Sequence, residues 1–478
     1  HDVSGMLLFN QSDEINTKAT NVEEALPYRF RGLAGRFTYG FDDRYFAEFN
    51  FGYNGSENFT PKNRYGFFPS VGLGWVISNE SFFEPLTNVI QYLKVRGTWG
   101  QVGNSQISGR RFAYLATVTD SSSTSYTFGK NMDQNYGTTA IDEYAVDVTW
   151  EVADKTDIGV DMRLLNNKLN LQFDYFKESR EGIYLRRSSI PSYVGMINNP
   201  YGNIGKVENK GFELSVNYAN SWGGDWSLSL MGNYSFNRNK VLEDDSTVVY
   251  PWQNTIGNKV GQRFGLVALG LFDSYEEIAA SPVQTGDTRP GDIKYKDING
   301  DGKIDEYDKV PIGWGSVPEI MYGFGFSVGW KNLSLTAMFQ GAAHVDAMLS
   351  GEGVLPFSQG SSRGNLLSNI TDRWTEENPR QNAFYPRLSI GNINMNYEES
   401  TWWLKDTDYL RLKNIELSYR LPDHWMKRIH LDNARIFIQG VNLLTFSSFK
   451  IWDVELGDGR GAKYPNIASV SLGINFNF

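Results

Sequence analysis

The stretch Ile467 to Phe478 reads IASVSLGINFNF, and it decides how the rest of the chain is interpreted. Every second residue from Ala468 to Phe478 is apolar, and the positions between them are serine, glycine or asparagine. A period of two places the apolar side chains on one face of a β-strand and the polar ones on the other. The stretch also has the roughly 9–11 residues that a strand needs to cross an outer membrane. We predict that it is the closing strand of a transmembrane β-barrel.

The same alternation recurs along the whole chain, in segments joined by connections that alternate between short and long. Short turns are expected at Asp42-Asp43, Asn166-Asn167, Gly223-Gly224 and Lys331-Asn332. In outer-membrane barrels the short turns face the periplasm and the long loops face outward. Aromatic residues beside these turns then form an interfacial girdle, which we predict to contain Phe41, Tyr45, Tyr218, Trp226, Trp330, Tyr419, Phe476 and Phe478.

The composition agrees with a membrane barrel and excludes several other classes of protein. Glycine (48 residues) and aromatic residues (14 %) are abundant in the 478 residues, yet only 40 % are hydrophobic, as expected where half of each strand faces a wet lumen. No apolar run approaches the ~18 residues of a membrane helix. The absence of cysteine excludes disulfides and thiolate chemistry, and a net charge of -10 argues against nucleic acid as a partner.

The predicted fold is all-β: an antiparallel transmembrane barrel of about fourteen strands, with residues 1–478 forming one barrel portion. Long extracellular loops are expected at about 102–153, 239–317 and 344–408. Residues 1–10 alternate like a strand and do not resemble a signal peptide, so the numbering is expected to begin inside a longer, exported precursor. The residues alone leave open whether the fourteen strands close by themselves or complete a larger barrel.

Five segments, taken in order, resemble the SusC/RagA family of TonB-dependent outer-membrane transporters. They are GNIGKVENKGFELSVNY (202–218), PEIMYGFGFSVGWKNLSLTAMFQG (318–341), DRWTEENP (372–379), YLRLKNIELSYRLP (409–422) and ARIFIQGVNLLTF (434–446). The resemblance implies the C-terminal portion of a 22-stranded barrel in the bacterial outer membrane, surrounded by outer-membrane lipid. The plug and the TonB-contacting region of the family are missing from this stretch.

The function implied by the resemblance is import of large nutrients, glycans or oligopeptides, together with a SusD-like surface lipoprotein. TonB would act through the missing N-terminal region. The alternative is a passive porin or structural barrel without a plug. An enzyme is not expected, because the four histidines lie in no metal-ligand spacing and no G-x-S-x-G or HExxH motif is present.

One loop carries the spacing of a calcium site, in the sequence DINGDGKIDEYD from Asp297 to Asp308. Oxygen ligands fall at positions 1, 3, 5, 9 and 12, glycine is at position 6, and position 7 offers a backbone carbonyl. We predict a structural Ca²⁺ site, with Mg²⁺ as the less favoured ion, held by Asp297, Asn299, Asp301, Lys303 (through its carbonyl), Asp305 and Asp308. The alternative is an ordinary Asn/Gly/Asp turn, and position 12 carries aspartate where glutamate is usual.

Two further sets of residues are candidates for contact with a substrate. Tryptophans in the loops either stack on sugar rings or, as we expect, pack the loops together: Trp252, Trp314, Trp374, Trp402, Trp403 and Trp452. Charged residues on the polar strand faces are expected to point into the lumen and to pair with one another or with a plug: Arg36, Arg96, Arg163, Glu213, Glu416 and Arg420.

Overall fold

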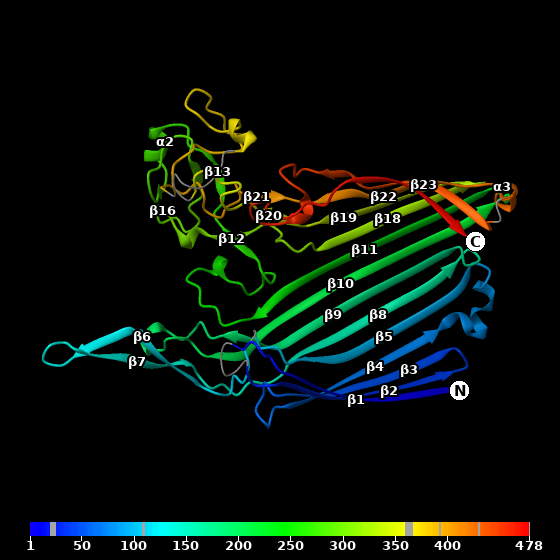
Figure 1. Ribbon diagram of the computed structural model, residues 1–478, viewed down its shortest axis with the longest axis horizontal. Coiled ribbons are helices and arrows are strands. Elements are labelled where there is room, and N and C mark those ends of the chain that lie inside the picture. Colours follow the sequence, from blue (N-terminus) through cyan, green and yellow to red (C-terminus); the bar gives the residue numbers. More distant parts are fainter. Residues whose placement is uncertain (20–24, 108–109, 359–366, 392, 429–430, 478) are drawn as a thin grey trace.

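The computed structural model describes residues 1–19, 25–107, 110–358, 367–391, 393–428 and 431–477, and its main element is one antiparallel sheet of fourteen strands (Figure 1). The order of the strands in the sheet follows their order in the chain. They are β1 (Asp2–Glu14), β2 (Tyr28–Phe41), β3 (Tyr45–Ser56), β4 (Tyr65–Val76), β5 (Ile90–Asn104), β8 (Glu151–Leu164), β9 (Leu169–Arg186), β10 (Tyr201–Trp222), β11 (Trp226–Glu243), β18 (Ile320–Trp330), β19 (Leu333–Ala343), β22 (Tyr409–Arg420), β23 (Asn433–Ser447) and β24 (Ser469–Asn477). The predicted number of strands and the all-β class are confirmed.

The predicted short turns lie at one end of the sheet. Asp42 and Asp43 have φ values of 53° and 50°, and Asn166 and Asn167 have 58° and 63°. Two successive residues with positive φ make the turn whose twist matches that of the flanking strands, and aspartate and asparagine tolerate this conformation better than most residues. Both chain termini lie at the same end (Figure 1).

The apolar face of the sheet points outward and no second layer covers it in the described part of the chain. Leu228 pairs with Val328, and Leu335 pairs with Val328 and Leu417, so apolar rows run from strand to strand. A row of exposed large apolar side chains is unfavourable in water but favourable against lipid. None of the described helices has the length and hydropathy needed to cross a membrane.

The aromatic girdle follows the prediction with one correction. Tyr45 stacks on Phe41 and on Trp75, and Trp226 lies against Trp330 across the strands. Tyr218, however, pairs with Leu230, because β10 continues four residues further than the alternation indicated. Trp222 pairs with Trp226 and takes the level expected for Tyr218. The predicted position of Phe478 lies outside the described residues.

The long connections carry smaller elements at the other end of the sheet. They include the hairpin β6 (Thr117–Phe128) and β7 (Gln134–Glu143), the strands β12 (Arg263–Gly265), β13 (Ala268–Leu271), β14 (Val283–Gln284), β15 (Ile293–Tyr295), β16 (Lys303–Ile304), β17 (Val310–Ile312), β20 (Asp346–Met348) and β21 (Leu404–Asp406), and the helix α2 (Tyr275–Ala279). Figure 1 shows β6 and β7 projecting from the sheet, while α2, β13 and β16 belong to a separate group of loops. At the short-turn end are the 3-10 helices η1 (Ile77–Asn79) and η2 (Ser81–Leu86) and the helix α3 (Asp423–Arg428).

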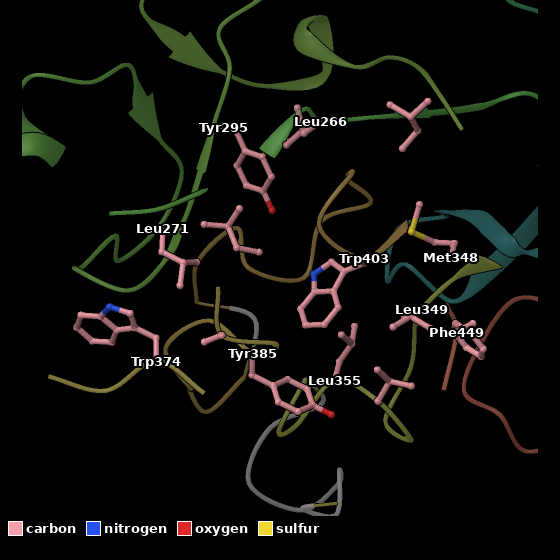
Figure 2. Packing of buried hydrophobic residues seen from close by; sticks show 14 of the residues in the cluster. Leu266, Leu271, Tyr295, Met348, Leu349, Leu355, Trp374, Tyr385, Trp403 and Phe449 are labelled. Atoms are coloured by element: carbon pink, nitrogen blue, oxygen red, sulfur yellow. The ribbon is translucent and has the colours of Figure 1, made fainter. Parts of the chain in front are cut away.

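The largest buried hydrophobic cluster lies in these loops and not in the sheet (Figure 2). Its residues come from three long connections, those between β11 and β18, between β19 and β22, and between β23 and β24. We call this group of loops the loop module. A barrel strand gives one face to lipid and the other to the lumen, so this core forms in the loops.

Candidate functional site

Charged side chains on the polar face of the sheet form ion pairs, as the sequence predicted. Arg36 pairs with Glu48 at 2.6 Å, on neighbouring strands. Glu416 pairs with Arg435 at 2.7 Å. Because these pairs lie on the face opposite the apolar rows, the polar face is the lumenal wall of the barrel.

One cluster on that wall has more carboxylates than cations. Arg96 on β5 contacts three aspartates, Asp157 at 2.9 Å, Asp161 at 3.5 Å, and Asp174. Glu213 lies on β10, the strand next to that of Asp174, and accepts a hydrogen bond from the Ser235 hydroxyl at 3.3 Å. The two remaining lumenal candidates make other contacts. The Arg163 guanidinium lies over the Tyr92 ring, 5.0 Å from its centroid, and Arg420 pairs with Asp423 at 3.7 Å near the short-turn end.

A cavity of about 770 Å³ lies where the lumenal wall meets the loop module. Its wall side is formed by β9, β10, β11, β18 and β19, and its loop side includes the connection between β23 and β24. Polar lining residues include Gln172, Asp174, Glu213, Asn233, Gln340 and Glu455. The cavity therefore offers carboxylate and amide groups, set among apolar side chains such as Met321 and Met338, to a solute at the outer end of the lumen.

The tryptophans of the loops mostly pack the loop module, as we expected. Trp403 is 1 % exposed, and its indole N–H donates to the Asn396 carbonyl at 2.7 Å. Trp374 is also buried in this core (Figure 2). Trp452 packs edge-on against Phe449. These rings are unavailable for stacking on a sugar.

Of the three remaining loop tryptophans, Trp402 packs against the same core and donates to the Phe384 carbonyl at 3.2 Å, and the other two have aromatic partners. Trp252 stacks on Tyr250 with ring centroids 4.6 Å apart, and its indole N–H donates to the Tyr307 carbonyl. Trp314 stacks on His344 with centroids 4.0 Å apart and an interplanar angle of 4°. Trp314 remains partly exposed at the rim of the barrel.

A buried polar centre orients the loop module. Asp292 accepts hydrogen bonds from the Arg387 guanidinium at 2.9 Å, from Asn394 at 3.1 Å and from Asn396 at 2.8 Å. A buried carboxylate is tolerated only where such donors replace its water. The centre therefore fixes the segment around Arg387 and Asn396 against β15.

Two groups of ion pairs fasten the loop module to the strands. Arg411 on β22 is 2 % exposed, and it donates to Asp453 at 2.8 Å, to Glu455 and to the Thr445 hydroxyl at 3.0 Å. These contacts fix the connection between β23 and β24 above the lumenal wall. The pattern of the sequence predicts none of them, because Arg411 lies on β22 whereas its acidic partners lie in the connection between β23 and β24.

Glu319, at the start of β18, is the centre of the second group. It accepts hydrogen bonds from Arg238 at 2.7 and 3.0 Å, from Lys259 at 3.3 Å and from His344 at 3.1 Å. Burial alone raises the pKa of Glu319, but the hydrogen bonds from Arg238 and His344 outweigh it and hold that pKa below its usual range. At neutral pH this carboxylate is therefore ionised and ties two strands to the loop that precedes β12.

In the predicted calcium loop, several carboxylates bind backbone amides of the same loop. Asp297 accepts from Gly300 N at 2.7 Å and from Gly302 N at 2.9 Å, and both glycines have positive φ, 76° and 82°. Asp301 accepts from Lys303 N at 2.9 Å. The chain thus turns sharply at the positions that the motif requires.

The last position of the loop is occupied differently. Asp308 is fully buried and accepts from the backbone N–H groups of Ile298, Asn299 and Asp305. These bonds use most of the acceptor capacity of its carboxylate. Within the described ranges, no three acidic or histidine side chains converge as a group of metal ligands.

Comparison with known proteins relates this chain to one family of outer-membrane receptors. The family model described as TonB dependent receptor-like, beta-barrel matches residues 9–443. TonB-dependent receptor P3 of Formosa agariphila is 28 % identical over 93 % of this chain and 45 % of its own length. TonB-dependent receptor SusC of Bacteroides thetaiotaomicron is 27 % identical over 93 % of this chain and 43 % of its own length. The chain therefore spans about half the length of the curated relatives that it matches.

A solved structure shows the same fold. The structure described as that of the RagAB peptide transporter superposes with a TM-score of 0.71 at 22 % identity, covering 97 % of this chain and 50 % of that chain. At this identity the likeness concerns the fold alone.

Proposed function

The chain belongs to the TonB-dependent receptor-like β-barrel family, an outer-membrane family, and on this premise we propose that it is the barrel portion of an importer of large nutrients. The substrates are glycans or oligopeptides. The single observation that carries the proposal is the family match over residues 9–443, since it coincides with a sheet whose outward face is apolar and whose inward face is charged and polar. The name of the SusC relative supports dependence on TonB.

The proposed partners are a SusD-like surface lipoprotein and TonB, the latter acting through a region outside these residues. A fixed loop module at the outer end of the barrel supports a protein partner on that side, because it presents a folded surface and not a set of separate loops. Affinity capture of the full-length receptor from native membranes in mild detergent is expected to bring down a lipoprotein of comparable abundance. Repeated recovery of the receptor alone contradicts the lipoprotein.

Uptake measurements distinguish the importer from a passive porin. Cells that express the full-length receptor are supplied with a labelled oligosaccharide or oligopeptide mixture above the size that diffuses through general porins. An energised importer loses uptake when an uncoupler dissipates the proton gradient, whereas a porin does not. Uptake that persists unchanged with the uncoupler rejects the importer.

We also propose that the loop from Asp297 to Asp308 binds Ca²⁺ in a structural role. Its donors are hard oxygens, which suit Ca²⁺ and to a lesser degree Mg²⁺. Asp297 and Asp301 retain free lone pairs after their backbone hydrogen bonds, and the two glycines already have the required φ. Asn299, Asp305 and the Lys303 carbonyl complete the set, while Asp308 contributes least because its oxygens are the most occupied. Even an affinity of about 10⁻⁴–10⁻³ M is sufficient for a site outside the cell.

The calcium proposal is tested by limited proteolysis of the full-length receptor. With Ca²⁺, the 285–315 region is expected to resist cleavage, and a chelator is expected to expose it. Asp301→Ala abolishes this protection by calcium. Glu306→Ala is the matched control, because Glu306 lies in the same loop at a position that provides no ligand and is 78 % exposed. Cleavage that does not depend on calcium in the unmodified receptor rejects the site.

A further inference from the structure

The connection between β4 and β5, residues 77–89, is much longer than the two-residue turns beside it and contains η1 and η2. It lies at the short-turn end of the sheet (Figure 1). Its sequence, ISNESFFEPLTNV, places two adjacent phenylalanines, a leucine and a valine in a turn that the fold does not need for its core.

This connection is hydrogen-bonded to both neighbouring turns and to the start of β5. On one side, Asn79 donates through its side-chain amide to the Asp43 carbonyl at 2.8 Å. On the other side, Leu165 N donates to the Val89 carbonyl at 3.1 Å, and the Gln91 side chain donates to the Thr87 carbonyl at 2.9 Å. Turn hydrogen bonds inside the connection, such as those from Phe83 N to the Glu80 carbonyl and from Thr87 N to the Glu84 carbonyl, satisfy further backbone groups and lower the desolvation cost of lying against lipid.

The acidic residue between η1 and η2 is likewise paired with neighbouring side chains. Glu80 accepts hydrogen bonds from the Tyr45 hydroxyl at 2.6 Å and from the Trp75 indole N–H at 3.0 Å, and it pairs with Arg44 at 3.3 Å. The hydrogen bond from Tyr45, followed by that from Trp75, holds the pKa of Glu80 below its usual range. Glu80 is therefore tied to the two girdle aromatics of β3 and β4.

The apolar side chains, in contrast, are turned outward. Phe82 is 65 % exposed, Leu86 51 % and Val89 58 %, whereas Phe83 is 4 % exposed and packs inward. Phe82 contacts the edge of Trp75, with ring centroids 6.4 Å apart and an interplanar angle of 62°. Trp75 in turn stacks on Tyr45 in the lipid-facing girdle. The exposed face of η2 is thus continuous with the lipid-facing surface of the barrel.

We propose that residues 77–89 form an interfacial anchor, in which Phe82 and Leu86 insert among the lipid chains of the leaflet at the short-turn end. The partner is lipid, and the argument is the continuity of Phe82 with the girdle through Trp75. By the rule that short turns face the periplasm, this is the inner leaflet of the outer membrane. Aromatic and aliphatic side chains beside a belt of tyrosine and tryptophan suit the boundary between lipid chains and headgroups. The anchor fixes the depth of the barrel at β4 and β5 and does not depend on what the receptor imports.

Site-directed spin labelling tests the proposal, and the 478 residues contain no cysteine that would interfere. Phe82→Cys and Leu86→Cys are introduced one at a time into the full-length receptor, any cysteine elsewhere being replaced. Glu84→Cys is the matched control, because Glu84 is an exposed, charged residue of the same helix η2. Each labelled receptor is placed in lipid nanodiscs, and its collision rates with oxygen, which partitions into lipid, and with a water-soluble nickel chelate are measured.

The labels at positions 82 and 86 are expected to show a ratio of oxygen to nickel collisions several-fold higher than the label at position 84. Equal ratios at the three positions overturn the proposal, because the segment then lies in water. Protection of position 82 from both reagents also overturns it, because another part of the receptor then covers Phe82. A shift in migration on heating shows that each variant is folded. All three side chains are largely exposed, so their replacement leaves the sheet intact.

Discussion

Arginine substitution along β11 tests both the register of the sheet and its depth in the membrane. The girdle residue Trp226 opens the strand, Leu228 and Leu230 follow on the apolar face, and Ser229 lies on the lumenal face. A strand advances about 3.4 Å per residue, and a tilt of about 40° reduces this to about 2.6 Å along the membrane normal. Leu228 then lies about 5 Å and Leu230 about 10 Å beyond the girdle, within an apolar band about 25 Å tall.

Leu230 is consequently close to the midplane, where an arginine facing lipid costs about 2–4 kcal/mol. Leu228→Arg, nearer the interface, is expected to cost about 1 kcal/mol, and Ser229→Arg still less because its side chain enters the lumen. The free energy of unfolding is measured by denaturant titration of the full-length receptor refolded into short-chain phosphatidylcholine vesicles. An equal cost at Ser229 and Leu230 refutes the assignment of the two faces. An equal cost at Leu228 and Leu230 refutes the depths in the membrane that are assigned to these two residues.

Three further changes address the loops and the rim. Arg411→Met leaves two acidic partners without their buried cation and is expected to cost about 3 kcal/mol locally, seen as faster proteolysis of residues 449–467; Arg420→Met, at an exposed pair, serves as its control. Trp403→Ala removes a fully buried ring and is expected to cost about 3–5 kcal/mol in the loop module, while the heat-dependent migration of the barrel stays unchanged. The folded-state pKa of Glu319 lies below its unfolded value, so its stabilisation is present above about pH 4.5 and is lost as the pH falls through the folded value. The protection factors of the amides around the start of β18, corrected for the intrinsic pH dependence of exchange, are expected to fall on acidification in the unmodified receptor and to stay unchanged with pH in Glu319→Gln.

The order of the fourteen strands was predictable because each strand pairs with the next one along the chain. In such a meander, alternation of period two and the turn residues are enough to place every strand, as the hairpin at Asn166 and Asn167 illustrates. The prediction was wrong where the alternation weakens. In Tyr218–Trp222 the apolar positions give way to alanine, asparagine and serine, so Tyr218 was assigned to the girdle although β10 continues to Trp222, beside the correctly predicted turn at Gly223-Gly224. The backbone hydrogen bonds between β10 and β11 continue to Trp222, although the alternation of apolar side chains ends earlier.

The chemistry of the loops was predictable only in part. The spacing from Asp297 to Asp308 predicted acidic residues around two tight glycine turns, and these turns are present. The use of Asp308 as an acceptor for three backbone amides had no sequence signal, since it depends on how the loop closes. The packing of Trp374 and Trp403 into a core was expected, but the residues that enclose them come from three connections far apart in the chain.

The sequence by itself determined the class of this protein, its strand order and the face of each strand that meets lipid, because these follow from a period of two and from contacts between neighbouring segments. The tertiary structure alone decided the loop module and its attachment to the barrel. Arg411 meets Asp453 and Glu455 across more than forty residues, and Arg263 meets Asp458 across 195. Such pairs bridge connections whose length and conformation no local pattern specifies, and the burial that gives them their strength exists only after the loops have packed together.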